Sequence, residues 1–183
     1  MVYRPSGPGT FPAVLYNHGR RYRGRRRRGG APIGDGSPGR QLAALAWLQQ
    51  QNFVQKGRIA VAGTSFGGIE AVLGAERGSY CAAIDSAGAA QSWAQSLLLQ
   101  SVMIRAVRNS KIPIFFFQAA NDYDLQPSKA LAAAMKDADK PYQLKIYPAF
   151  GESSGDGHSF GYFGASIWAD DVFRFLEDNC REK

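Results

Sequence analysis

The sequence contains few of the residues that build metal sites and disulfide frameworks. It has two cysteines and two histidines in 183 residues. The spacing of Cys81 and Cys180 indicates neither a zinc site nor a disulfide framework, so we expect two free structural thiols in a cytoplasmic protein. No apolar run reaches the roughly 18 residues of a membrane span. Residues 1–9 also lack the apolar region of a signal peptide.

Outside one short segment, the sequence carries no excess of positive or negative charge. The net charge is +7, and seven arginines lie between Arg20 and Arg28. Apart from this arginine tract, basic and acidic residues are equal in number, 15 of each. This balance argues against a nucleic-acid-binding domain with a broad positive face. We expect the tract to be a solvated loop, and a local arm that binds nucleic acid or another polyanion is the alternative.

Length and patterning predict one α/β domain over residues 1–183. Hydrophobic residues make up 45% and charged residues 20%, as in ordinary globular proteins. Short apolar runs alternate with helical patterns, which predicts a mostly parallel sheet in a three-layer sandwich. The Gly-rich segments 20–36 and 151–164 are expected loops, and Lys56-Gly57 an expected turn. Strands are expected at 11–17, 58–62, 82–85, 112–118 and 143–147, and helices at 37–51, 66–77, 93–108, 127–137 and around Trp168, Val172, Phe175 and Leu176.

The most specific motif is Gly63-Thr64-Ser65-Phe66-Gly67, which lies between an expected strand and an expected helix. Glycines two residues before and after a serine allow the sharp strand–turn–helix of a nucleophile elbow. The helix N-terminus would direct free N–H groups at a developing oxyanion. An incidental Gly/Ser turn is the alternative, and the strand–helix context favours a nucleophilic Ser65.

A serine nucleophile needs a base and an acid that orients the base. His158 lies in a Gly-rich segment after the last expected strand, where a histidine has little packing role. Asp122 follows the strand 112–118, and Asp124 is the rival for the acid. The order Ser65, Asp122, His158 is that of α/β hydrolases. We therefore predict a catalytic triad of these three residues, with no metal.

Further site residues follow from the same arrangement. The N–H groups of Phe66 and of Gly19 or Arg20 are predicted to form the oxyanion hole, because the strand ending at His18 should lie beside Ser65. His18 itself is expected to be a hydrogen-bonded residue that shapes this turn. Trp93, Tyr123 and Phe160 either line the substrate pocket or belong to the core.

The sequence resembles the dienelactone hydrolase family of α/β hydrolases. The resemblance rests on residues 12–19 and 60–68, on Asn121-Asp122 and on Gly157-His158. It implies a cofactor-free hydrolase of the carboxylesterase type, with Ser65 as nucleophile, His158 as base and Asp122 as acid. Family members that open dienelactones use cysteine as nucleophile, and this chain has serine.

The chain is shorter than the family pattern. Residues 20–36 cannot hold the helix and strand that the family has there, so we expect a truncated α/β-hydrolase fold of about five strands. The expected strand order is 1-2-3-4-5 and not the flavodoxin-like 2-1-3-4-5, because the oxyanion loop must lie beside Ser65. The strand at 11–17 then becomes an edge, open to pairing with a second copy in a homodimer.

The predicted function is the cleavage of a small-molecule carboxylic ester through an acyl-enzyme. No membrane partner is expected. Two alternatives remain: a polyanion-binding module that uses the arginine tract, and a catalytically weak, shortened relic of the hydrolase fold.

Overall fold

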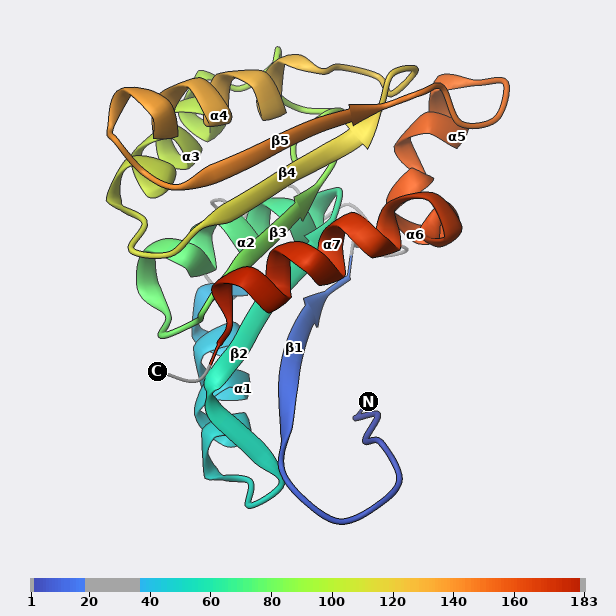
Figure 1. Cartoon of the computed structure of the whole chain (residues 1–183). Helices are drawn as coiled ribbons and strands as arrows, with labels where there is room; N and C mark the ends of the chain where they lie inside the picture. The colour runs from blue at the N-terminus through green and yellow to red at the C-terminus, as the bar shows by residue number, and fades with distance from the viewer. Residues whose placement is uncertain (1, 19–36, 182–183) are drawn as a thin grey trace, which may run out of the picture.

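The computed structural model describes residues 2–18 and 37–181. Five parallel strands form one sheet in the order β1-β2-β3-β4-β5, as the sequence predicted (Figure 1). The oxyanion loop residues Gly19 and Arg20 and the arginine tract lie outside the described residues. The strands are β1 (Phe11–Asn17), β2 (Val54–Thr64), β3 (Ala83–Ser86), β4 (Ile114–Ala119) and β5 (Tyr142–Tyr147).

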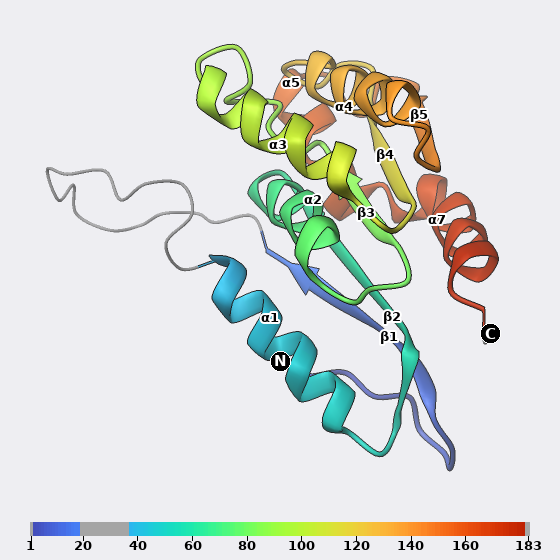
Figure 2. The ribbon, with the colours of Figure 1, turned by 90° about the vertical axis from the view of Figure 1, so that its left-hand side faces the viewer.

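Helices cover both faces of the sheet, which confirms the three-layer prediction (Figure 2). One face packs against α1 (Ser37–Gln50), α2 (Phe66–Arg77), α3 (Leu97–Asn109) and α4 (Gln126–Asp137). The other face packs against α7 (Ala165–Asn179), preceded by the short α6 (Phe160–Phe163). In the described parts of the chain, no helix has both the length and the apolar character needed to span a bilayer.

Strand β4 is buried along its whole length and therefore carries apolar residues on both faces of the sheet. Phe116 points into the core beneath α1–α4, whereas Phe115 and Phe117 point into the core beneath α7. All three are at most 2% exposed. Each buried phenylalanine contributes about 1.5–3 kcal/mol of transfer free energy. The packed core on both faces of the sheet therefore holds the ends of the strands in fixed positions.

Two element boundaries differ from the prediction. Lys56-Gly57 is not a turn, because β2 already begins at Val54 and pairs there with Phe11 of β1. The helix expected from residue 93 begins only at Leu97, where Ser96 accepts a hydrogen bond from the N–H of Leu99 at 3.2 Å. This N-cap satisfies a backbone donor that would otherwise lack a partner.

The Gly-rich segment 151–164 is not a plain loop, because it contains α5 (Ser154–His158) as well as α6. Ser153 caps α5, and Asp156 completes a reciprocal capping box with the Ser153 N–H. These hydrogen bonds hold the pKa of Asp156 below its usual value. The capping box offsets the poor helix propensity of Gly155 and Gly157. The prediction of a loop was wrong because it weighed the glycines above the cap.

The prediction of free thiols was also wrong, because Cys81 and Cys180 form a disulfide. Cys81 precedes β3 and Cys180 follows α7, and 99 residues separate them in sequence. Helix α7 lies across the sheet (Figure 1), so Cys180, directly after this helix, reaches Cys81 near the start of β3. The expectation of a cytoplasmic location loses the support of reduced cysteines.

Candidate active site

Ser65 lies on a sharp turn between β2 and α2. Its backbone has φ 59° and ψ −120°, and its N–H donates to the carbonyl oxygen of Ser86 at 2.9 Å. A Cβ at Gly63 would overlap the Gly67 backbone, and a Cβ at Gly67 would overlap the Asn17 carbonyl. Both glycines are therefore required for the turn and for the close packing of α2 on β1. The strained turn is that expected of a nucleophile elbow.

The structure brings Ser65, His158 and Asp122 together from three separate elements. The Nε2 atom of His158 lies 2.8 Å from the Oγ of Ser65, and its Nδ1 lies 2.9 Å from the Oδ1 of Asp122. The Asp122 side chain is fully buried and that of His158 is 12% exposed. With Nδ1 protonated and hydrogen-bonded to the carboxylate, Nε2 is free to accept the Ser65 proton.

Asp122, and not Asp124, contacts the imidazole. Its Oδ1 also accepts the N–H of Tyr123 at 2.7 Å, and its Oδ2 accepts the Nε2 amide of Gln118 at 2.9 Å. The Oε1 of Gln118 accepts the Ser128 hydroxyl at 2.6 Å. Asp124 instead accepts the N–H of Gln126 at 2.8 Å, at the start of α4. The carboxylate of Asp122 is thus fixed on both oxygens.

Asn121 holds the segment that carries His158. Its side-chain amide donates to the carbonyl oxygens of Phe150 and Ser153, and its Oδ1 accepts the N–H of Phe150 at 2.9 Å. A Cβ at Gly157 would overlap Asn121, so α5 packs directly on the turn after β4. Figure 1 shows α5 beyond the ends of β4 and β5. Sequence analysis missed the positioning roles of Asn121 and Gln118, because no pattern in the sequence shows which partners their side-chain amides meet.

Of the predicted oxyanion donors, only Phe66 lies among the described residues. It is the first residue of α2, where backbone N–H groups lack helical partners. His18 follows β1, and its exposed ring packs edge-on against Tyr16. The turn that it was expected to shape lies outside the described residues, so this role stays a prediction.

The three predicted pocket residues separate into core and surface. Trp93 is 7% and Phe160 is 1% exposed, and they belong to the cores on opposite faces of the sheet. Tyr123 is 49% exposed, and its ring centroid lies 5.3 Å from that of His158. Tyr123 and Asp124 form one wall of an open groove of about 520 Å³, opposite residues 90–95. Within the described residues, no triad residue lines this groove, and Tyr123 is the wall residue that also contacts His158.

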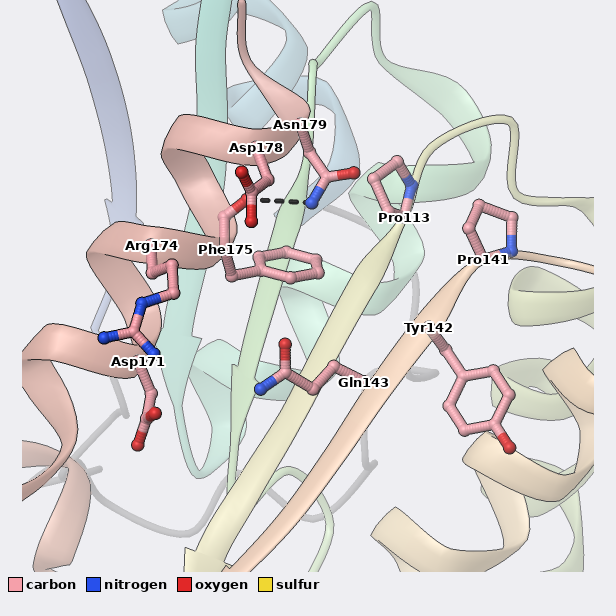
Figure 3. A pocket seen from close by; sticks show the side chains of 9 residues that line it. All are labelled: Pro113, Pro141, Tyr142, Gln143, Asp171, Arg174, Phe175, Asp178 and Asn179. Atoms are coloured by element: carbon pink, nitrogen blue, oxygen red, sulfur yellow. Dashed lines mark hydrogen bonds between the residues drawn. The ribbon is translucent and has the colours of Figure 1, made fainter.

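A second cavity lies at the opposite end of the sheet (Figure 3). It measures about 290 Å³, and its lining includes Pro113 and Pro141, which precede β4 and β5, and Arg174 of α7. Triad residues are absent from this lining. Among the described residues, no group of three or more histidine, cysteine, aspartate or glutamate side chains is placed to hold a metal ion.

One buried carboxyl lies beneath the elbow without touching the triad. Asp85 of β3 is fully buried, and its Oδ1 accepts the N–H of Gly88 at 2.9 Å. Its Oδ2 has no hydrogen-bond partner within the described structure. Burial raises the pKa of Asp85 to about 7. The carboxyl packs against Gly68 of α2, where a Cβ would overlap it.

Comparisons with known proteins identify the family and the fold. The profile of the dienelactone hydrolase family matches residues 34–167. An esterase from Pyrococcus furiosus superposes with a TM-score of 0.66 at 16% identity, covering 93% of this chain and 82% of its own. Dipeptidyl peptidase 4 of Porphyromonas gingivalis superposes with a TM-score of 0.64 at 21% identity, covering 80% of this chain and 23% of its own.

A puromycin-hydrolyzing peptidase from Mycobacterium tuberculosis has the same fold, with a TM-score of 0.61 at 20% identity, over 79% of this chain and 26% of its own. The chain thus spans about a quarter of the length of these peptidases. A search of curated proteins found no match.

Proposed function

This chain belongs to the dienelactone hydrolase family, and we propose that it is a serine hydrolase that cleaves carboxylic esters through an acyl-enzyme. The observation that carries the proposal is the hydrogen-bonded series Ser65 Oγ, His158 Nε2, His158 Nδ1 and Asp122 Oδ1, with distances of 2.8 and 2.9 Å. These distances are those required of a nucleophile, a base and an orienting acid.

In the first half-reaction, the Ser65 oxygen attacks the ester carbonyl while His158 Nε2 takes the hydroxyl proton. The negative charge on the former carbonyl oxygen is stabilised by the N–H of Phe66 and a donor from Gly19 or Arg20. His158 then donates the proton to the alcohol oxygen, the carbon–oxygen bond breaks and the alcohol leaves. Asp122 stabilises the imidazolium in each step without taking its proton.

In the second half-reaction, His158 takes a proton from water, and the hydroxide attacks the acyl carbon. Collapse of this intermediate returns the proton to the Ser65 oxygen and releases the acid. The acyl group is held covalently between the two steps, so a burst of alcohol release is expected wherever deacylation is the slower step.

Esters are favoured over amides by the extent of the structural matches. The match to the esterase covers most of both chains, whereas the matches to the peptidases cover about a quarter of theirs. In the described residues, the groove between residues 90–95 and Tyr123 lies within the domain itself, and Tyr123 joins it to His158 through a ring contact. A small ester can enter such a site directly.

The test is hydrolysis of p-nitrophenyl acetate and butyrate by the purified protein, with Ser65→Ala as control. A fluorophosphonate probe should label wild-type protein at Ser65, as located by peptide mass spectrometry. Turnover that is absent from wild type, or equal in the Ser65→Ala variant, contradicts the proposal. Labelling without turnover identifies a weak relic, and salt-sensitive binding of nucleic acid without labelling favours the polyanion-binding alternative.

A further inference from the structure

Asp124 is a carboxylate that the triad does not use. Its Oδ1 accepts the N–H of Gln126 at 2.8 Å, and its backbone oxygen accepts the Gln118 amide at 3.0 Å. No ion pair to Asp124 occurs among the described residues. Asp124 belongs to the lining of the groove that Tyr123 shares, so within the described residues it adds a negative charge without an ion-pair partner to that wall.

The rest of the groove suits a positively charged group. Tyr123 presents a half-exposed aromatic ring next to Asp124, and an aromatic face attracts cations within about 6 Å. The opposite wall carries Ala90 and Ala94 with the neutral amides of Gln91 and Gln95. No lysine, arginine or histidine occurs in the lining as far as the described residues form it. A carboxylate, an aromatic ring and small neutral side chains together form a surface that recognises ammonium groups.

The position of the groove indicates which part of the substrate it would bind. The base must protonate the leaving oxygen, so the leaving alcohol lies against the imidazole. Tyr123 packs on the imidazole of His158, with ring centroids 5.3 Å apart, and the same Tyr123 forms the groove wall. A leaving group that extends from the protonated oxygen therefore passes along Tyr123 towards Asp124.

We propose that this groove is a subsite for a cationic leaving group, so that the preferred substrates are esters of amino alcohols, with Asp124 and Tyr123 as the residues that set this specificity. The proposal rests on the proposed esterase function and adds a substrate class to it. An ion pair at such a partly exposed site raises affinity by up to about fivefold, and an exposed cation–π contact has an effect of similar size.

The experiment compares two esters of equal shape, acetylcholine and 3,3-dimethylbutyl acetate, which differ in the charge of the alcohol. For wild-type protein, kcat/KM should be about five- to tenfold higher with acetylcholine than with 3,3-dimethylbutyl acetate. In Asp124→Asn this ratio should fall to about two or below. Asparagine keeps an oxygen that accepts the Gln126 N–H, so the start of α4 is retained. Asp137→Asn, at the exposed far end of α4, removes the same charge and should leave the ratio unchanged.

The outcomes separate this proposal from the esterase function. Hydrolysis of both esters at equal kcat/KM overturns the cationic subsite and leaves the esterase in place. If the ratio of kcat/KM for acetylcholine to that for 3,3-dimethylbutyl acetate falls equally in Asp124→Asn and Asp137→Asn, the preference for the cationic ester is an effect of net charge. That result overturns the role of Asp124. A preference confined to p-nitrophenyl esters with a cationic acyl group, and lost in Asp124→Asn, overturns the assignment to the leaving group. If neither ester is hydrolysed by wild type, both proposals fail.

Discussion

Ser65 is one of four described non-glycine residues with a positive φ, and two others, Ala87 and Ala89, lie in the segment after β3. Such conformations cost about 1–3 kcal/mol each and persist only where surrounding contacts impose them. At Ser65 the constraint comes from the hydrogen bond to Ser86 and from the contact of Gly67 with Asn17. Backbone strain is thus concentrated at Ser65 and in the segment after β3 that leads to the groove lining at Ala90.

Ser65→Ala and His158→Ala should each lower esterase turnover by about 10⁴-fold or more, because triad residues act as a unit. Steady-state hydrolysis of p-nitrophenyl butyrate measures the loss. Unchanged circular dichroism and melting temperature serve as the control for folding. Near-wild-type turnover in the His158 variant would remove it from the role of base.

The two candidate acids should differ in their effects. Asp122→Asn should reduce kcat by several orders of magnitude, because an amide favours the wrong tautomer of His158. Asp124→Asn should cost far less with a neutral ester, because Asp124 does not contact the imidazole. The comparison of kcat for p-nitrophenyl acetate decides between them, and the opposite ranking would show that Asp124 is the acid.

Asp85 should make stability depend on pH. Its pKa in the fold is about 7, above the ordinary 3.8, so folding favours the neutral carboxyl. The stabilisation of the fold by the neutral Asp85 carboxyl is fully present below about pH 4 and is lost as the pH rises through 7. Asp85→Asn should therefore flatten the fall in stability between pH 5 and pH 8, as measured by urea denaturation at both values. A fall as steep as that of wild type would show that other groups cause it.

At the scale of elements, the site joins short segments to a rigid sheet. Helix α5 has five residues, yet it holds His158 in place through the Ser153 cap and the hydrogen bonds of Asn121. The chain continues from α5 through α6 and α7 to Cys180, where the disulfide to Cys81 joins it to the start of β3. His158 itself is thus held by the polar contacts of α5 and of the turn after β4.

Replacing both cysteines with serine should lower the free energy of unfolding by about 4–5 kcal/mol, since the bridge closes a loop of nearly 100 residues. Guanidinium denaturation of the double variant, beside wild type with and without reductant, measures the change. Reduced wild type and the double variant should agree. Equal stability of all three forms would show that the bridge is not formed in solution.

Most elements could be predicted because their signals are local, whereas the strand order and the proximity of Ser65, Asp122 and His158 were predicted from the order of motifs along the chain and the family pattern. The elbow is one pentapeptide, and each strand is one apolar run. The disulfide could not be predicted, because a separation of 99 residues leaves no local pattern. The roles of Gln118 and Asn121 depend on which side chains meet across the sheet end, and an isolated amide in the sequence does not show this.

At the scale of the whole molecule, β1 is the exposed edge that the shortened chain was expected to have. Val14 is 50% and Tyr16 is 42% exposed on this strand. Tyr16 also accepts or donates a hydrogen bond with the Thr64 hydroxyl at 2.8 Å, so its ring is held beside the elbow strand. An apolar edge strand favours pairing between copies.

We therefore propose a homodimer through β1. Val14→Lys should shift the protein towards monomer, because an ammonium on the edge opposes strand pairing. Sedimentation velocity over a hundredfold range of concentration measures the shift. Leu97→Lys, at an 80% exposed position on α3, is the matched control and should not change the association. A wild-type protein that stays monomeric throughout would contradict the proposal.

The bridge between Cys81 and Cys180 also determines how the molecule responds to mechanical force. When the two ends are pulled apart, tension passes through the sulfur atoms and bypasses the residues between them, including Asp122 and His158. Ser65 precedes Cys81 and remains under load. In an optical trap, the bridged protein should extend only by its segments outside the loop, and reductant should release about 350 Å more. The base and acid are thus shielded from tension, while the nucleophile is not.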